Sequence, residues 1–381
     1  MKIHATKFLL VAVAILMAIT RASAQEFGPW STPMNLGSTV NSPCSDQHPA
    51  LSKDGLTLIF ASDRIVDDQG HTIGCLAPTP SSTAFYLHLW VSQRECLDIN
   101  DHACDWDTPK PLTKVNSLFQ DNAPNLTTDG HWLFFHSERP SDCNPDSPGG
   151  GHRYFELWAA HRQDKRDDFD WETPINLGCT LNMTGASEAG PTFWEDDSTG
   201  TLYLYFNRDP LAPDSDLMGN ATDIYVSTCT ADLDTCNRQR LWSSARLIPQ
   251  LSSTMRDTRT AIRRRDGLEM IIASNRTGTV GLIDLWVSTR PSVQFAQDNW
   301  SAPINLNQDN LDKCTQLGMD PGSCPVLNST ATDGAPALSW DGQTLIFYSN
   351  RAGGNGSNDL YMSTRQKLCD SATNTSCVVS Q

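Results

Sequence analysis

The chain repeats the same two short phrases five times, and this repetition constrains its fold more than any other feature. A phrase that opens with Trp begins at Trp30, Trp106, Trp171, Trp242 and Trp300. A second phrase follows each time, with anchor residues Pro49, Pro124, Pro191, Thr260 and Pro336, which lie 75, 67, 69 and 76 residues apart. A repeat of nearly fixed period indicates one supersecondary unit copied along the chain.

Each repeat predicts four short strands. The first strand lies at the anchor, and in four repeats it ends in an Asp-Gly pair suited to a tight hairpin: Asp54-Gly55, Asp129-Gly130, Asp266-Gly267 and Asp341-Gly342. The second strand is rich in aromatic and β-branched residues, as in LTLIFAS. The third strand begins at Leu87, Phe155, Thr222, Ile283 or Asn358. The Trp phrase supplies the fourth, because an edge strand tolerates its Pro.

Five such units without helical periodicity favour an all-β fold, a five-bladed β-propeller of four-stranded antiparallel blades. The first Trp phrase precedes the first inner strand, whereas the fifth repeat ends without one after Tyr361. The N-terminal strand is therefore predicted to complete the last blade and close the ring. We expect residues 25–381 to form this single domain.

Residues 1–24 have the pattern of a secretory signal peptide. Lys2 and Lys7 precede an apolar run from Phe8 to Ile19, and Ala22-Ser23-Ala24 offers small residues for cleavage. The run is too short for a comfortable membrane span. We expect an exported protein, periplasmic or extracellular, that does not insert into a membrane.

All twelve cysteines follow the predicted cleavage site, which favours disulfides in an oxidising compartment. Close spacing suggests that Cys96 pairs with Cys104, Cys229 with Cys236, Cys314 with Cys324, and Cys369 with Cys377. The remaining partners are Cys44 with Cys75, and Cys143 with Cys179. Zinc is the alternative, but no Cys-x-x-Cys spacing with a matching second pair occurs.

The chain is strongly acidic. Its formal charge is −16, and loss of Lys2, Lys7 and Arg21 with the signal peptide leaves −19. Such a surface repels nucleic acid phosphates and anionic membranes, so neither is an expected partner. We expect a monomer whose binding partner is a protein or a glycan.

The repeat resembles a known family. The pattern P-x-L-S-x-D-G-x-x-L-x-F-x-S-x-R followed by D-L-W-V-S-x-R is similar to the WD-repeat-like motif of the β-propeller in TolB and many exported bacterial proteins. Blades one, two and five match it well, whereas the third has Trp194-Glu195-Asp196-Asp197 and the fourth has Thr260 in place of Pro. The resemblance implies the fold but no activity, and the amino-terminal domain of TolB is absent.

Two repeated features are predicted to be architectural. Each second strand ends in an Arg, and most third strands open with an acid; we expect the two to pair across neighbouring strands. The arginines are Arg64, Arg139, Arg208, Arg276 and Arg351, and the acids are Glu156, Asp223, Asp284 and Asp359, with His88 in the first blade. The five Trp residues are expected to pack between blades.

A further acid lies three residues before each anchor: Asp46, Asp121, Glu188, Asp257 and Asp333. We call these five residues the acid ring, because the innermost strands should gather them around one mouth of the central channel. Like charges at close quarters raise one another's pKa or recruit a cation, and calcium would suit such a ring. The alternative is that each acid accepts hydrogen bonds from backbone groups of its own blade or the next.

Departures from the repeat are the best candidates for function. One residue before each anchor stand His48, Ala123, Gly190, Arg259 and Ala335. Strand alternation puts His48 and Arg259 on the side of the acid ring, and Arg256 lies close by. Arginine binds carboxylates with paired donors, so a uronic acid is one candidate ligand. The run Arg263-Arg264-Arg265 is predicted to form an exposed hairpin.

These residues leave three functions open. The main prediction is a non-catalytic binding protein with a protein or glycan ligand at the channel mouth, because the chain contains no G-x-S-x-G elbow, H-E-x-x-H motif or phosphate-binding loop. The alternative is a glycan-cleaving enzyme, either a glycoside hydrolase that uses the acid ring or a lyase with His48 as base and Arg259 at a uronate. A purely structural role is the third.

Overall fold

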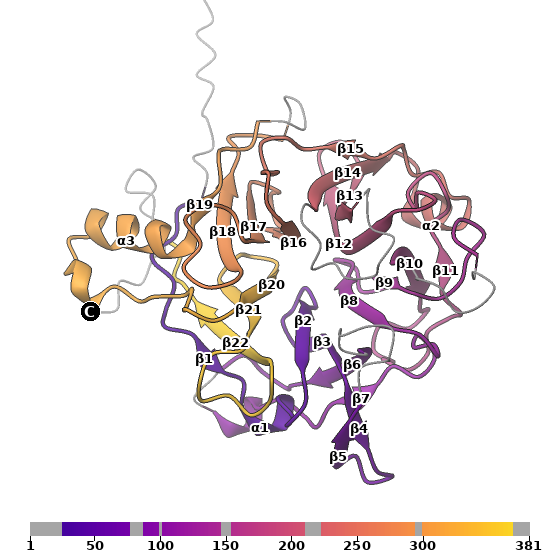
Figure 1. Ribbon diagram of the computed structural model, residues 1–381, viewed down its shortest axis with the longest axis horizontal. Coiled ribbons are helices and arrows are strands. Elements are labelled where there is room, and N and C mark those ends of the chain that lie inside the picture. Colours follow the sequence, from indigo (N-terminus) through magenta and orange to yellow (C-terminus); the bar gives the residue numbers. More distant parts are fainter. Residues whose placement is uncertain are drawn as a thin grey trace, which may run out of the picture.

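The computed structural model describes residues 25–76, 87–98, 101–145, 154–209, 222–293 and 299–368. Within these residues, five four-stranded antiparallel sheets stand around one central axis as the blades of a propeller (Figure 1). The predicted five-bladed β-propeller is confirmed. The predicted signal peptide lies outside the described residues.

Each blade adds its strands from the centre outward. The innermost strands are β2 (Asp46–Leu51), β8 (Asp121–Leu126), β12 (Ser187–Asp196), β16 (Asp257–Ile262) and β20 (Asp333–Leu338). The second strands are β3 (Thr57–Ser62), β9 (Trp132–Ser137), β13 (Thr201–Asp209), β17 (Glu269–Ser274) and β21 (Thr344–Ser349). The third are β6 (His88–Gln93), β10 (Glu156–His161), β14 (Asp223–Cys229), β18 (Asp284–Thr289) and β22 (Asp359–Thr364). The outer strands are β7 (Lys110–Pro111), β11 (Ile175–Asn176), β15 (Arg246–Leu247), β19 (Ile304–Asn305) and β1 (Met34–Asn35). We number the blades 1 to 5 by their inner strands in this order.

The ring closes as predicted, because β1 pairs with β22 of the last blade. Met34 lies opposite Met362, and Asn35 lies opposite Tyr361. The two ends of the propeller domain are thereby held in one sheet, which ties the first repeat to the fifth.

Among the described residues, the hydrophobic core consists of five large clusters, one at each contact between neighbouring blades, and a small cluster of Phe155 and Ala189. Leu133 and Phe135 of blade 2, for example, pack with Ile59 of blade 1. All five phrase-opening Trp residues are buried in these clusters, as predicted. Burial of apolar surface between blades, rather than within a single sheet, therefore stabilises the ring.

Every inner strand carries a β-bulge at the residue before the anchor. In blade 1 the register shifts between Gln47 and Ala50, and the bulged residue His48 has φ of 51°. The same left-handed conformation recurs at Ala123, Gly190, Arg259 and Ala335, with φ between 44° and 63°. A bulge bends its strand and re-aims a side chain, so it decides which groups face the central channel.

Short helices occur in the connections, although the sequence shows no helical period. They are α1 (Gly37–Val40), α2 (Leu233–Arg238), α3 (Leu306–Gln316) and the 3₁₀ turns η1 (His102–Cys104) and η2 (Pro321–Ser323). A further hairpin, β4 (Arg64–Val66) with β5 (Thr72–Cys75), projects from blade 1. In the part of the chain that is described, no helix has the length and apolar character needed to cross a bilayer.

Five of the six predicted disulfides are confirmed: Cys44–Cys75, Cys96–Cys104, Cys143–Cys179, Cys229–Cys236 and Cys314–Cys324. They close short loops, between residues that lie 7 to 36 positions apart in the sequence. Cross-links in such loops restrict the unfolded chain and stabilise the native one.

The sixth predicted disulfide is not among the bonds that the structure contains. Cys369 lies outside the described residues, and Cys377 lies outside them as well, since the description ends at Leu368. The pairing of Cys369 with Cys377 therefore stays a prediction from their spacing.

Candidate active site

The acid ring lies inside the blades, in ion pairs with the arginines that end the second strands. Its five members are fully buried. Arg139 Nη2 lies 2.5 Å from Asp121, and Arg208 Nε lies 2.7 Å from Glu188. The equivalent pairs are Arg64–Asp46, Arg276–Asp257 and Arg351–Asp333. Four of these acids also accept the backbone N–H of a Ser four residues upstream, for example Ser117 for Asp121, at 2.5 Å.

These contacts correct the predicted pairing of the strand-ending arginines with the acids of the third strands. Three of those four acids instead accept hydrogen bonds from Asn side chains of the outer strands. Asn305 donates to Asp284 at 2.8 Å, and Asn176 donates to Glu156 at 2.6 Å. The bulge explains the difference, because it adds a residue to the inner strand and brings its acid beside the arginine.

Glu188 differs from its four counterparts. It is longer than Asp, and Arg208 itself, rather than a Ser, lies opposite it in the sheet. Its Oε2 atom has no hydrogen-bond partner. Burial raises the pKa of Glu188 to about 7, in spite of the opposing charge of Arg208.

Two positions in each blade face the central channel near the bulges. Where the side chain at one position is large, the side chain at the other is small. The first is the bulged residue, and the second is the residue of the next strand that lies opposite the position just before the bulge. In blades 1 and 4 the bulged residue is large (His48, Arg259) and the second position is Ala61 or Ala273. In the other blades the bulged residue is Ala or Gly, and the second position holds His136, Asn207 or Tyr348.

One polar side chain per blade therefore reaches this level of the channel. We call the set the polar ring: His48, His136, Asn207, Arg259 and Tyr348. The His48 and Tyr348 rings meet edge to face with centroids 5.7 Å apart. The backbone N–H of Arg259 points to the Asn207 side-chain oxygen at 3.4 Å. Contacts thus join His48 to Tyr348 and Arg259 to Asn207, and the charge of Arg259 also acts on His48.

Arg259 spans the channel. Its Nη1 atom lies 3.1 Å from Nδ1 of His136, two blades away. The side chain passes over Gly190 of the intervening blade, where a Cβ atom would come within 2.8 Å of Arg259 Cδ and Nη1. Gly190 also donates its backbone N–H to His136 Nδ1 at 3.2 Å. Nδ1 of His136 is therefore an acceptor, and its ring proton is on Nε2.

The polar ring is cationic, and the described residues place no counter-charge beside it. Arg259 is only 8 % exposed, and among the described residues no carboxylate lies within ion-pair distance of it. Burial and the neighbouring Arg256 lower the pKa of Arg259 to about 9, so it is still charged at neutral pH. Burial and the charge of Arg259 hold the pKa values of His48 and His136 well below the usual range. Both imidazoles are therefore neutral at pH 7.

Three atoms of the polar ring are buried without a hydrogen-bond partner: Nδ1 of His48, Nε2 of His136 and Nδ2 of Asn207. Buried polar atoms are normally paired, so a cluster of unpaired ones indicates a binding site. Tyr348 and Arg256 are partly exposed, which marks the side from which a ligand can reach the ring. Burial raises the pKa of the Tyr348 phenol, which therefore keeps its proton at neutral pH.

The arginine run of blade 4 is not an exposed hairpin, which corrects the prediction. Arg263 pairs with Asp266 and Glu269 at 2.8 and 2.6 Å. Arg264 is buried in the channel, and only Arg265 is exposed. The hairpin turns inward because buried acid and carbonyl groups accept the guanidinium hydrogen bonds.

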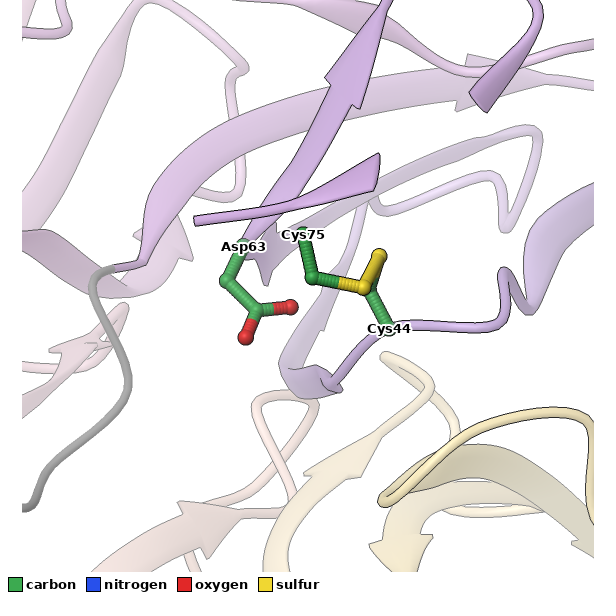
Figure 2. A group of neighbouring side chains, drawn as sticks. All are labelled: Cys44, Asp63 and Cys75. Atoms are coloured by element: carbon green, nitrogen blue, oxygen red, sulfur yellow. A yellow bond between two sulfur atoms is a disulfide. The ribbon is translucent and has the colours of Figure 1, made fainter. Parts of the chain in front are cut away.

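Metal-ligand side chains do not cluster at the channel. Among the described residues, three potential ligands approach one another only at Cys44, Asp63 and Cys75 and at Cys96, Asp101 and Cys104. In both groups the two cysteines form a disulfide, and Figure 2 shows Asp63 beside the Cys44–Cys75 bond. Neither group therefore offers a free thiolate. The carboxylates of the acid ring, which the sequence suggested for calcium, remain separated in their own blades.

Comparison with known proteins finds no matching family model and no matching curated protein. Solved structures with a similar fold include an alpha-L-arabinofuranosidase from Lactobacillus brevis. The two sequences are 12 % identical, the match covers 84 % of this chain and 90 % of that chain, and the TM-score is 0.49. A family 117 glycoside hydrolase from Zobellia galactanivorans has 10 % identity, covers 93 % and 95 %, and has a TM-score of 0.47. A GH43_1 enzyme from Xanthomonas citri has 12 % identity, covers 91 % and 92 %, and also has a TM-score of 0.47.

These structures correct two predictions. None of those named here is a TolB-type protein, so the recognition of that family from the repeat motif is wrong. Those named here are enzymes that act on glycans, so the main prediction of a non-catalytic binding protein is corrected as well. At such low identity the likeness concerns the fold alone, and the chemistry has to be argued from the polar ring.

The sequence identified two members of the polar ring, His48 and Arg259, together with the neighbouring Arg256. The sequence does not single out His136, Asn207 and Tyr348, because they lie in second strands that are rich in aromatic and β-branched residues. A signal was present: the five second-strand positions read Ala, His, Asn, Ala and Tyr, and they are large only where the bulged residue is small.

Proposed function

We propose that this protein cleaves a uronate-containing glycan by β-elimination, with the polar ring as the reaction centre. One observation carries the proposal: Arg259, a buried arginine with no carboxylate partner among the described residues, lies beside a neutral imidazole and a protonated phenol. An enzyme that eliminates across a uronate needs these three functions, which are charge neutralisation, a base and an acid.

The substrate carboxylate supplies the missing counter-charge. A buried cation is costly unless it is paired, so an anion beside Arg259 offsets its desolvation. Arginine binds carboxylates with paired donors, and Nε2–H of His136 and the amide of Asn207 are further donors without partners. Neutralising the carboxylate also acidifies the hydrogen on the adjacent carbon.

We assign the base to His48 and the acid to Tyr348. Nδ1 of His48 takes the proton from the carbon next to the carboxylate, and the released electron pair forms a double bond to the neighbouring carbon. The bond from that carbon to the glycosidic oxygen breaks, and this oxygen accepts the hydroxyl proton of Tyr348. Proton exchange with water then restores both side chains. Contact between the two rings supports this division of roles, because the proton is removed from one carbon and donated to the oxygen on the next carbon.

The acid ring argues against hydrolysis. A glycosidase needs two carboxyl groups across one glycosidic bond, as acid and base or acid and nucleophile. Here the five acids are buried in ion pairs, each with the arginine of its own blade. We therefore favour elimination over hydrolysis. The five disulfides support a site of action outside the cytoplasm, in the periplasm or the medium; a protein partner and the monomeric state stay predictions.

The test is incubation of the mature protein with polygalacturonate and alginate, and with a neutral xylan as the control polymer. Elimination creates an unsaturated sugar end that absorbs ultraviolet light. We expect this product from a uronate polymer only, with losses of about 100-fold or more in His48→Gln, Arg259→Met and Tyr348→Phe. Arg265→Met removes an exposed charge of the same blade and should keep full activity.

New reducing ends without ultraviolet absorbance would show hydrolysis and contradict the elimination. Absence of any product from all three polymers would contradict glycan cleavage for these substrates.

A further inference from the structure

The central channel continues below the polar ring as a cavity of about 40 Å³. The bulged residues His48 and Arg259 line one end, and Arg264 lines the other. Between them the wall is formed mainly by Ala, Pro and Leu residues of the inner strands, with Thr192 and Thr260. The cavity therefore has two guanidinium groups and an otherwise neutral lining.

Arg264 crosses the far end of the channel. It donates from Nη1 to the carbonyl oxygen of Leu126 at 2.7 Å and from Nη2 to that of Leu51 at 2.8 Å. Its own carbonyl accepts the indole N–H of Trp194 at 3.1 Å, which fixes its backbone. A guanidinium has five N–H groups, so these two bonds leave further donors at the cavity wall.

The charge of Arg264 has no carboxylate partner among the described residues. Burial alone lowers its pKa to about 10, so it stays protonated at neutral pH. The acid ring cannot neutralise it, because those carboxylates pair with other arginines and do not line the cavity. Buried charges in proteins are normally paired, so a bound anion would stabilise the Arg264 guanidinium.

The remaining lining groups suit an anion as well. Asn125 lines the cavity and uses its side-chain oxygen to accept the N–H of Phe193 at 2.9 Å, which leaves its NH₂ group as a donor. One water-sized sphere needs at least about 10–15 Å³, so the cavity has room for a small ion with roughly two waters, but not for a sugar.

We propose that the channel binds a small monovalent anion, of the halide class, against Arg264. The cavity is shared with His48 and Arg259 of the polar ring, but the proposed contact is with Arg264, which follows Arg259 by five residues along the chain. An anion there offsets the charge of a side chain that joins blades 1, 2 and 4, and so it stabilises the closed ring.

The experiment compares thermal unfolding of the mature protein in sodium chloride and in sodium sulfate at equal ionic strength. Binding to the folded state alone raises Tm with ligand concentration. We expect a saturable rise of a few degrees with chloride in the wild type and in Arg265→Met, and no such rise in Arg264→Met. Arg265→Met is the matched control, since it removes the neighbouring exposed charge.

A crystal grown in sodium bromide provides a direct reading that does not depend on how the variants fold. An anomalous bromide peak in contact with the Arg264 guanidinium supports the proposal. Bromide peaks on the surface only, or a chloride response that is equal in the wild type and Arg264→Met, would overturn it.

Discussion

Nη1 of Arg259 lies 3.1 Å from Nδ1 of His136, although blade 3 stands between the two blades that carry them. The contact is made over Gly190, the only member of the five bulged positions without a side chain. Three residues far apart in sequence thus depend on one another. The guanidinium of Arg259 is held across the channel because the blade beneath it leaves the space free.

Gly190→Ala should therefore displace Arg259. The bulge itself accepts a methyl group, since Ala123 and Ala335 occupy the same position with φ of 49° and 44°. The added Cβ would meet the end of the Arg259 side chain at 2.8 Å, so we expect this side chain to move, with a loss of about 1 kcal/mol in the free energy of unfolding and a loss of activity. Gly200→Ala is the control: its φ of 66° is similar, but nothing lies within 4 Å of its Cβ. Equal losses in both variants would argue against the displacement.

His48 should remain neutral in solution far below the usual titration range of histidine. Burial lowers its pKa, and the charge of Arg259 lowers it further. Imidazole NMR spectra recorded over a pH series, assigned with His48→Gln, measure this directly. In Arg259→Met we expect the pKa of His48 to rise, whereas Arg265→Met should leave it unchanged. Titration of His48 near 6.5 in the wild type would contradict the described environment.

Glu188 should make the protein less stable as pH rises. Its pKa is about 7 in the folded state against 4.5 as its ordinary value, so between these values the folded state holds a proton that the unfolded state has released. The contribution of Glu188 to the free energy of unfolding therefore falls from pH 4.5 to 7, by at most about 1.4 kcal/mol per pH unit. Denaturant titrations should show this slope reduced in Glu188→Gln. Above about pH 8 the difference between the two proteins should no longer depend on pH.

Each ion pair of the acid ring should contribute more to the free energy of unfolding than an ion pair on the surface. Asp121→Asn leaves the Arg139 guanidinium, whose side chain is 13 % exposed, without its fully buried anion, so we expect a loss of about 3 kcal/mol in the free energy of unfolding. Asp170→Asn breaks the pair with Lys114, in which both side chains are 56 % exposed, and should cost less than about 1 kcal/mol. Similar losses for the two variants would contradict an architectural role for the ring.

The repeat was sufficient to predict the fold because its information is local and occurs five times. Alternating strands, Asp-Gly turns and the leading Trp30 phrase determine the blade, the number of blades and the closure by the N-terminal strand. Cysteine spacing likewise predicted the five disulfides that the structure contains, whereas the sixth pair, Cys369 with Cys377, lies beyond the described residues. The motif was a poor guide to family, however, because many propellers share the hairpin pattern that the repeat encodes.

The sequence by itself determined the five-bladed ring, the five observed disulfides and the burial of the Trp residues, since each follows from strand pattern and spacing along the repeats. Only the tertiary structure decided which polar groups meet. Arg259 and His136 are 123 residues apart and in non-adjacent blades, and a bulge in each inner strand turns their side chains toward one axis. Only the tertiary structure shows that the acid ring pairs with the arginines that end the second strands, because one extra residue in a strand changes which side chains lie opposite each other.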